Sequence, residues 1–128
     1  MTTWIIPCNV KYYDVFGAFN TLKRIEWRQS TKVEVGDQVY VYVGRPYSAI
    51  MFKCKVNRVN ITDLSIDDSA FNKELSTLPP YGRYMELELT DTFPKDQFEL
   101  GTLREKGFKG SFQGPFRATS ELLQLLEE

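Results

Sequence analysis

The sequence contains no histidine and only two cysteines, Cys8 and Cys54. The lack of histidine excludes a histidine base and the commonest zinc ligand, and two such distant cysteines match neither a metal-binding spacing nor a disulfide framework. We therefore expect no metal, no cofactor and two reduced thiols. No stretch approaches the roughly 20 apolar residues of a membrane span, and no basic, hydrophobic leader opens the chain. These absences predict a cytoplasmic protein that does not cross a membrane.

The composition is that of an ordinary folded protein. The chain has 128 residues, of which 42% are hydrophobic and 26% are charged. This size predicts one domain over residues 1–128 that is large enough to bury a core, and we expect it to be a monomer.

The net charge is only −1, which argues against a protein that coats nucleic acid indiscriminately. The charges are unevenly distributed, however, because residues 1–61 carry nine basic and four acidic side chains, whereas residues 62–100 carry three and nine. Residues 101–117 are again basic, with four basic side chains and one acidic side chain. A basic face would suit a phosphate backbone, although solvated lysines on strand faces would give the same count.

An apolar run, Trp4 to Ile6, precedes the short polar segment Pro7-Cys8-Asn9. The run predicts a buried strand that ends at Pro7, because proline cannot donate to a sheet ladder. Asp14 is placed to cap a helix over about residues 15–24. That helix would carry the chain back toward the point where the strand ends.

Because the predicted helix brings the chain back to the end of the first strand, we expect two polar segments to face each other. Asn9 follows the strand, and Trp27-Arg28-Gln29-Ser30 follows the helix. The indole of Trp27 offers a surface for stacking, and the amide and hydroxyl groups beside it suit the edge of a flat ligand. The segment therefore predicts a ligand pocket. In the alternative interpretation, Trp27 closes the core and Asn9 caps a turn.

Alternating apolar residues predict three further strands, over residues 38–44, 49–59 and 84–91. In the first of these strands, three valines point to one face and two tyrosines to the other. In the other two, the side chains that point outward have opposite charges, which predicts antiparallel neighbours with a solvated outer face. These charged residues are Lys53 and Lys55 on one strand and Glu86 and Glu88 on the other.

The remaining segments predict short helices and a closing strand. One or two helical turns follow Asp67 or Asp68, a small helix covers about residues 99–106, and a leucine-rich helix follows Thr119 or Ser120. Three alternating phenylalanines within residues 108–117 predict an irregular strand that closes back toward the first. The element order predicts a mixed α+β fold with mainly antiparallel strands.

Four segments of the sequence, in chain order, resemble the EVE domain and the related YTH domain, which are members of the PUA-like superfamily. The segments are Trp-Ile-Ile-Pro-Cys-Asn, Ile-Glu-Trp-Arg-Gln-Ser, Val-Gly-Asp-Gln-Val-Tyr-Val-Tyr-Val and Ala-Ile-Met-Phe-Lys-Cys-Lys-Val. The resemblance implies a PUA-like pseudo-barrel with peripheral helices.

The resemblance also implies a site. In YTH domains the tryptophan at the place of Trp27 is one wall of an aromatic cage around a methylated adenine, and the polar residue at the place of Asn9 bonds the base edge. EVE domains carry a glutamine at the place of Gln113. The expected ligand-binding residues are Trp27, Asn9, Gln29, Ser30, Gln113, Cys8 and Arg28. The sequence departs from YTH domains in having Arg28 at the place of a small residue and no third tryptophan for a second wall.

The predicted function is binding rather than catalysis. We expect a module that accepts a modified nucleobase of DNA or RNA, with no catalytic residues of its own. The phosphate backbone is expected to meet exposed cations at Arg45, Lys11, Arg83 and Lys109. Some bacterial EVE domains are fused to HNH-type nucleases, so the resemblance implies a possible nuclease partner in modification-dependent restriction, or a role in an RNA-modification system. Two alternatives remain, a small PUA-like hydrolase acting on a modified nucleoside and a protein-interaction module using the C-terminal leucines.

Overall fold

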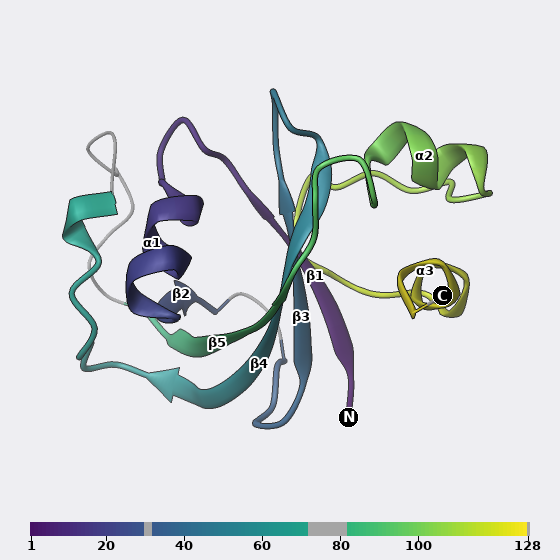
Figure 1. Ribbon diagram of the computed structural model, residues 1–128. Helices are drawn as coiled ribbons and strands as arrows, with labels where there is room; N and C mark the ends of the chain where they lie inside the picture. The colour runs from purple at the N-terminus through teal and green to yellow at the C-terminus, as the bar shows by residue number, and fades with distance from the viewer. Residues whose placement is uncertain (30–31, 72–81, 128) are drawn as a thin grey trace.

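The computed structural model describes residues 1–29, 32–71 and 82–127, and the six strands in this part of the chain form one curved sheet (Figure 1). The order of the strands across the sheet is β2-β5-β4-β3-β1-β6. β1 and β3 are parallel, and the other neighbours are antiparallel. The strands are β1 (Thr3–Cys8), β2 (Arg24–Arg28), β3 (Gln38–Val43), β4 (Ala49–Ile61), β5 (Tyr84–Thr92) and β6 (Phe116–Arg117). The expected α+β fold with mainly antiparallel strands is confirmed.

β1 does not end at Pro7, as the sequence predicted, but continues to Cys8. On one side β1 pairs with β3 along its whole length. On the other side β6 pairs only with Trp4 and Ile5. The missing N–H of Pro7 therefore costs the sheet no hydrogen bond to β6, and the strand tolerates the proline.

The first helix, α1 (Val15–Leu22), begins where the sequence predicted and ends two residues earlier. The Asp14 carboxylate accepts a hydrogen bond from the Gly17 N–H at 3.1 Å, which caps the helix. A Cβ atom at Gly17 would collide with this carboxylate, so a larger residue there would displace the capping side chain. Lys23 has a left-handed backbone (φ 62°) that ends α1, and β2 starts at the next residue.

The other helices are η1 (Ser69–Phe71), α2 (Leu100–Glu105) and α3 (Ser120–Glu127). The Thr119 hydroxyl accepts a hydrogen bond from the Leu122 N–H at 3.2 Å, so Thr119 caps α3 as one of the two predicted candidates. α1 lies on one side of the sheet, whereas α2 and α3 lie on the other (Figure 1). No helix in the described ranges is long and apolar enough to cross a membrane.

Each face of the sheet carries its own hydrophobic core, and β3 contributes to both. The alternation predicted for β3 is confirmed, because its valines and its tyrosines are buried on opposite faces. The core on the α1 side includes Ile6, Phe19, Val39, Val41, Val43, Phe52, Cys54 and Leu87. The core on the α2 and α3 side includes Ile5, Tyr40, Tyr42, Ile50, Phe98, Leu103, Phe112, Leu122 and Leu126.

The leucines of α3 are used within the fold. Leu122 and Leu126 are buried, and Leu123 and Leu125 are partly buried against the same core. This arrangement confirms that α3 lays its apolar face on the sheet. The same arrangement weakens the protein-interaction alternative, because these leucines are not displayed to solvent as a docking face.

β4 and β5 are antiparallel neighbours, as their opposite charges predicted, with Lys55 opposite Glu88. The expectation of a solvated outer face is wrong for Glu86, which is only 5% exposed. The side-chain amide of Asn57 donates to Glu86 at 3.1 Å and to Glu88 at 2.7 Å. The sequence pattern could not show that this face is covered.

Glu26 shows how part of the sheet face around Glu86 is covered. It lies directly opposite Glu86 on the neighbouring strand and is 8% exposed. Its carboxylate accepts hydrogen bonds from the backbone N–H groups of Ser65 and Ile66, at 2.9 and 2.7 Å. Two like charges opposite each other on a sheet are unfavourable, and these backbone donors offset the repulsion. The segment that follows β4 is thereby tied across β2.

Candidate functional site

Trp27 lies in strand β2, opposite Met85 of β5, where the sequence predicted a polar segment and no strand. Its side chain is half-buried and packs at the margin of the core on the α1 side. The ring of Tyr13 meets it edge to face, with 5.5 Å between ring centroids and an interplanar angle of 90°. Trp27 therefore contributes to the core and still keeps accessible surface.

Tyr13 is held in place by the segment that follows β4. Its hydroxyl donates to the Asp68 carboxylate at 2.8 Å, and the neighbouring Asp14 N–H donates to the carbonyl of Phe71 at 2.7 Å. Burial, and then the hydrogen bond to Asp68, raise the pKa of Tyr13, so the phenol stays protonated and keeps donating. The ring that touches Trp27 is thus fixed from two sides.

Gln29 follows β2 and is buried. Its side-chain NH2 donates to the side-chain oxygen of Asn60 at 3.1 Å, and its side-chain oxygen accepts the Asn60 backbone N–H at 2.8 Å. Arg83 donates to the same Asn60 oxygen at 3.1 Å. Both ends of the Gln29 amide are therefore engaged within the protein, and Gln29 connects β2 to the end of β4.

Asn9 is exposed in the turn between β1 and α1. Its side-chain oxygen accepts the backbone N–H of Lys11 at 2.9 Å, and its carbonyl accepts the N–H groups of Tyr12 and Tyr13 at 3.0 and 3.2 Å. The alternative interpretation, in which Asn9 caps a turn, is thus confirmed. The turn that Asn9 shapes is also the one that presents Tyr13 to Trp27.

The other predicted ligand-binding residues are dispersed. Cys8 is the buried last residue of β1, and Ser30 lies outside the described residues. Arg28 ends β2, half-buried, with its guanidinium beside Gly82. Gln113 is exposed next to Phe112, a residue of the core on the α2 and α3 side.

The predicted backbone cations are all exposed, but they lie on different segments. Lys11 is in the Asn9 turn, with its ammonium 5.6 Å from the centroid of the Tyr12 ring. Arg83 immediately precedes β5 and joins the Gln29 network. Arg45 lies between β3 and β4, and Lys109 follows α2. The structure therefore places Lys11 on the Tyr13 side of Trp27, and Arg83 beside the network that follows β2.

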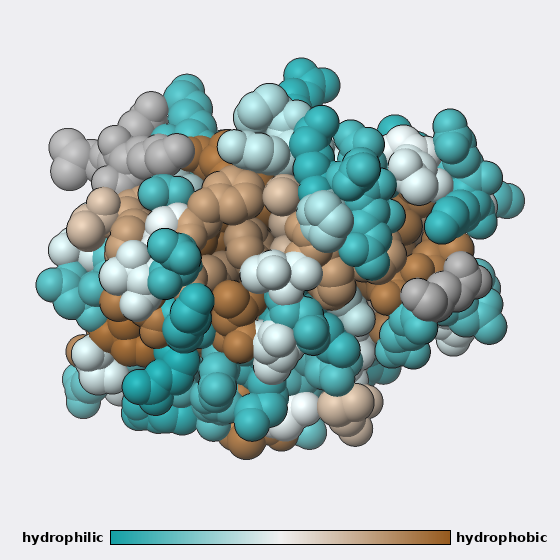
Figure 2. Space-filling view, viewed as in Figure 1, coloured by the Kyte–Doolittle hydropathy of each residue, from teal (hydrophilic) through white to brown (hydrophobic). Residues whose placement is uncertain are grey.

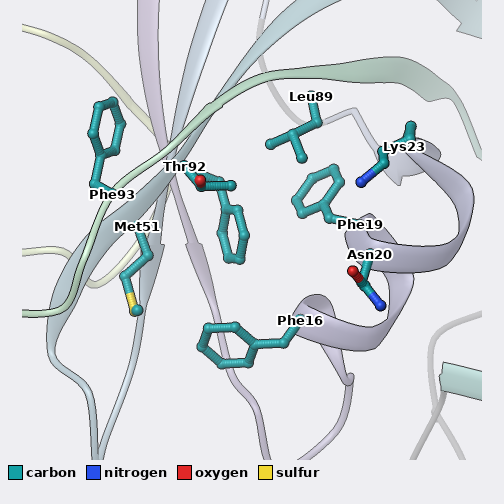
Figure 3. A pocket seen from close by; sticks show the side chains of 9 residues that line it. Phe16, Phe19, Asn20, Lys23, Met51, Leu89, Thr92 and Phe93 are labelled. Carbon is teal, nitrogen blue, oxygen red and sulfur yellow. The ribbon is translucent and has the colours of Figure 1, made fainter.

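The structure contains a pocket of about 390 Å³ elsewhere on the α1 side, between α1 and strands β4 and β5 (Figure 3). None of the expected ligand-binding residues within the described ranges, Asn9, Trp27, Gln29 and Gln113 among them, lines it. Its lining is Phe16, Phe19, Asn20, Lys23, Met51, Phe52, Leu89, Thr92 and Phe93. Phe16 and Phe19 have helical spacing that indicated only a core face, and no local signal joined them to the distant strand residues.

The described residues contain no group of three or more acidic, cysteine or histidine side chains placed to hold a metal ion. Cys8 and Cys54 are both buried, and burial raises the pKa of the Cys54 thiol. A buried thiol with a raised pKa is a poor nucleophile.

No protein-family model and no curated protein matches this chain. Solved structures do match it. An ASCH domain from Zymomonas mobilis is 12% identical with a TM-score of 0.61, and the match covers 98% of this chain and 94% of that one. The fold is PUA-like.

Two further structures share the PUA-like fold of this chain. A hypothetical protein from Leishmania major is 13% identical, with a TM-score of 0.63 over 99% of this chain and 92% of the other. A protein from Rhodopseudomonas palustris is 10% identical, with a TM-score of 0.62 over 98% and 90%. Identities this low show the fold alone. EVE domains belong to the same superfamily as ASCH domains, and the EVE resemblance itself stays a prediction.

Proposed function

We propose that this protein is a nucleic-acid-binding module that holds an unpaired or flipped modified base against Trp27. The observation that carries the proposal is the half-buried indole in perpendicular contact with Tyr13. In such a pair the edge of one ring covers part of the face of the other, so the base would stack on a ring face that this contact leaves open. Tyr13 thus takes the role of the second wall, for which the sequence offers no tryptophan.

The surroundings of this ring pair support this proposal. Lys11 is exposed in the turn that presents Tyr13, and Arg83 is exposed next to the Gln29 network. Cations at these places suit phosphates on both sides of a bound nucleotide. The hydrogen bond from Tyr13 to Asp68 fixes one wall before the ligand arrives, which lowers the entropic cost of binding.

The PUA-like fold is compatible with either RNA or DNA as the partner. We propose that the module supplies recognition and that a partner nuclease, or an RNA-modification enzyme, supplies the chemistry. The lack of histidine in the chain and the unreactive setting of Cys54 support this division.

The test is binding to matched oligonucleotides that differ only in one base modification, as RNA and as single- and double-stranded DNA. We expect a modified base to bind more tightly than its unmodified counterpart. Trp27→Ala should weaken that binding by roughly ten- to a hundredfold, because stacking on an aromatic ring is worth about 1–3 kcal/mol per base. Fluorescence anisotropy of labelled oligonucleotides measures both effects.

The control is Trp4→Ala, because Trp4 is also half-buried on a strand but bonds to Asp37 through its indole N–H at 3.0 Å. This variant should keep its affinity at temperatures where it is folded. Undiminished affinity of Trp27→Ala would remove the residue on which the proposal rests. Conversion of a free modified nucleoside into product would favour the hydrolase alternative instead.

A further inference from the structure

The pocket between α1 and strands β4 and β5 has the size of a small-molecule site. Its volume of about 390 Å³ lies within the range of roughly 300–1,000 Å³ that is usual for such sites. Hydrophobic residues gather between α1 and the sheet in the space-filling view, which has the same orientation as Figure 1 (Figure 2). The lining includes neither Trp27 nor Tyr13, so the pocket is distinct from the proposed base site.

The walls of the pocket are largely aromatic. Phe16 and Phe19, from α1, each contact Phe52 of β4, with ring centroids 5.5 and 4.9 Å apart. Phe93 and Met51 bound the opposite side in the close view (Figure 3). Aromatic rings and a polarizable thioether favour a flat, apolar molecule over a flexible chain, because ring faces gain by stacking.

The mouth of the pocket carries one charge. Among the described residues that line the pocket, Lys23 is the sole ionisable one, and Asn20 and Thr92 are exposed polar residues beside it. The left-handed backbone of Lys23 (φ 62°) places its carbonyl to accept the Leu89 N–H at 2.9 Å, which fixes the base of the side chain to β5. A single cation above an apolar pocket suits one anionic group and not a polyanion.

We propose that this pocket binds a small, flat, mostly apolar molecule with a single anionic group. The rings lie among the phenylalanines, and the anion pairs with the Lys23 ammonium at the mouth. Asn20 and Thr92 offer hydrogen bonds to the polar end of the same molecule. A free aromatic carboxylate is the simplest member of this class.

Three probes separate flatness from charge, namely 2-naphthoate, neutral 2-naphthalenemethanol and flexible octanoate. Two-dimensional NMR of the labelled protein should show 2-naphthoate shifting the backbone amides of Phe16, Asn20, Lys23 and Thr92. The alcohol should bind about two- to fivefold more weakly, as expected for the loss of a solvent-exposed ion pair. Octanoate should bind more weakly still. Equal binding of all three probes, or shifts confined to residues outside the pocket, would overturn the proposal.

Variants at the mouth test the location. Thr92→Trp places a large ring in the mouth from an exposed position and should abolish 2-naphthoate binding. Thr90→Trp is the matched control, because Thr90 is exposed on the same strand and is not part of the lining. If Thr92→Trp does not fold, Asn20→Trp blocks the pocket from the helix side. Persistent binding in a folded, blocked variant would contradict the proposal.

Lys23 requires a substitution that tolerates the left-handed backbone. Lys23→Asn does so and removes the charge, so it should make 2-naphthoate and its alcohol bind equally well. Lys23→Arg keeps the charge and should preserve the preference for the acid. Trp27→Ala should leave 2-naphthoate binding unchanged, so a failure of the proposed base site is distinguishable from a failure of this pocket.

Discussion

The two faces of the sheet are built from the same strands, but they are closed to different degrees. On the α2 and α3 side, Tyr40 and Tyr42 of β3 stack on Phe93 and Phe112, with centroids 6.2 and 4.2 Å apart. On the α1 side, β3 presents valines to the core, and the pocket is lined from α1, β4, β5 and Phe93. A helix of eight residues, α1, leaves this pocket open.

The difference between the faces explains where binding is possible. Large rings from the sheet meet rings from the covering segments on the α2 and α3 side, which yields a sealed core, and one of these rings, Phe93, also borders the pocket. The α1 side retains the pocket and the half-buried Trp27. The pocket and Trp27 lie on β4, β5 and β2, so the two faces differ mainly in the segments that cover them. The predictions below test this division.

The largest effect is expected for Leu122→Ala in the sealed core. Leu122 is fully buried, so its truncation should lower the free energy of unfolding by about 2–5 kcal/mol. Urea unfolding measures the loss, with half-buried Leu123→Ala on the same helix as the milder control. Binding on the α1 side should persist wherever the Leu122 variant is folded. A loss below that of Leu123→Ala would mean that this face is not sealed.

Asp37 ties the strands that both faces share. It is buried and accepts the N–H groups of Thr2 and Glu34 and the indole N–H of Trp4, each at 3.0 Å. Asp37→Ala leaves these donors without their acceptor and should cost about 1–3 kcal/mol of stability. In contrast to Leu122→Ala, it should disturb both faces, which amide hydrogen exchange on each side of the sheet would show.

The same residue predicts a pH dependence. Burial raises the pKa of Asp37, but the hydrogen bonds from Thr2, Trp4 and Glu34 outweigh it and lower the pKa below its ordinary 3.8. A carboxylate with a lowered pKa stabilises the fold above its unfolded pKa, and this stabilisation disappears as pH falls through the folded value. The wild type should therefore lose stability below about pH 4. Asp37→Asn should flatten this part of the profile, and an unchanged profile would contradict the assignment.

A smaller effect, confined to the α1 side, is expected for Tyr13→Phe. The variant keeps the ring against Trp27 and loses the hydrogen bond to Asp68. Stability should fall by about 0.5–1.5 kcal/mol, the usual net contribution of one hydrogen bond. Thermal unfolding measures the change, and hydrogen exchange should increase around η1 but not around α3. An equal increase at both places would indicate that the faces are not independent.

The smallest effect is expected for Lys95→Ala. Lys95 and Glu99 form an ion pair at 3.4 Å, and their side chains are 51% and 37% exposed. Exposed pairs contribute at most about 1 kcal/mol, and salt screens them. The loss of stability should be measurable only at low ionic strength. A loss comparable to that of Leu122→Ala would show that the surface, and not the sealed core, holds this side together.

The features that the sequence predicted correctly depend on local rules. The alternation along β3 predicted which side chains share a face, and Asp14 and Thr119 predicted two helix caps. In each case the chemistry involves residues within a few positions of one another. One correct prediction concerned distant segments: the lysines of β4 and the glutamates of β5 predicted that these strands pair, because opposite charges on neighbouring strands attract.

The errors have a common physical origin in contacts between distant segments. Glu86 has the spacing of a solvated residue, and only the segment after β4 buries it, through Glu26. The residues around Trp27 indicated a polar segment and no strand, but pairing with β5 makes Trp27 part of a strand. The α1 pocket requires Met51 and Thr92, which no local pattern connects to the helix.

The pairing of β1 with β6 has a consequence for how the chain acquires its structure. Trp4 pairs with Arg117, so the first strand borders residues that lie on the order of a hundred positions later. β1 also pairs in parallel with β3, so the chain that contains α1 and β2 must loop out before these two strands can meet. Non-local pairing of this kind slows folding, because the entropy of closing a long loop is lost before the contacts form. Until β6 arrives, the outer edge of β1 remains an unpaired strand edge, and the nascent chain is most exposed to misassociation during that interval.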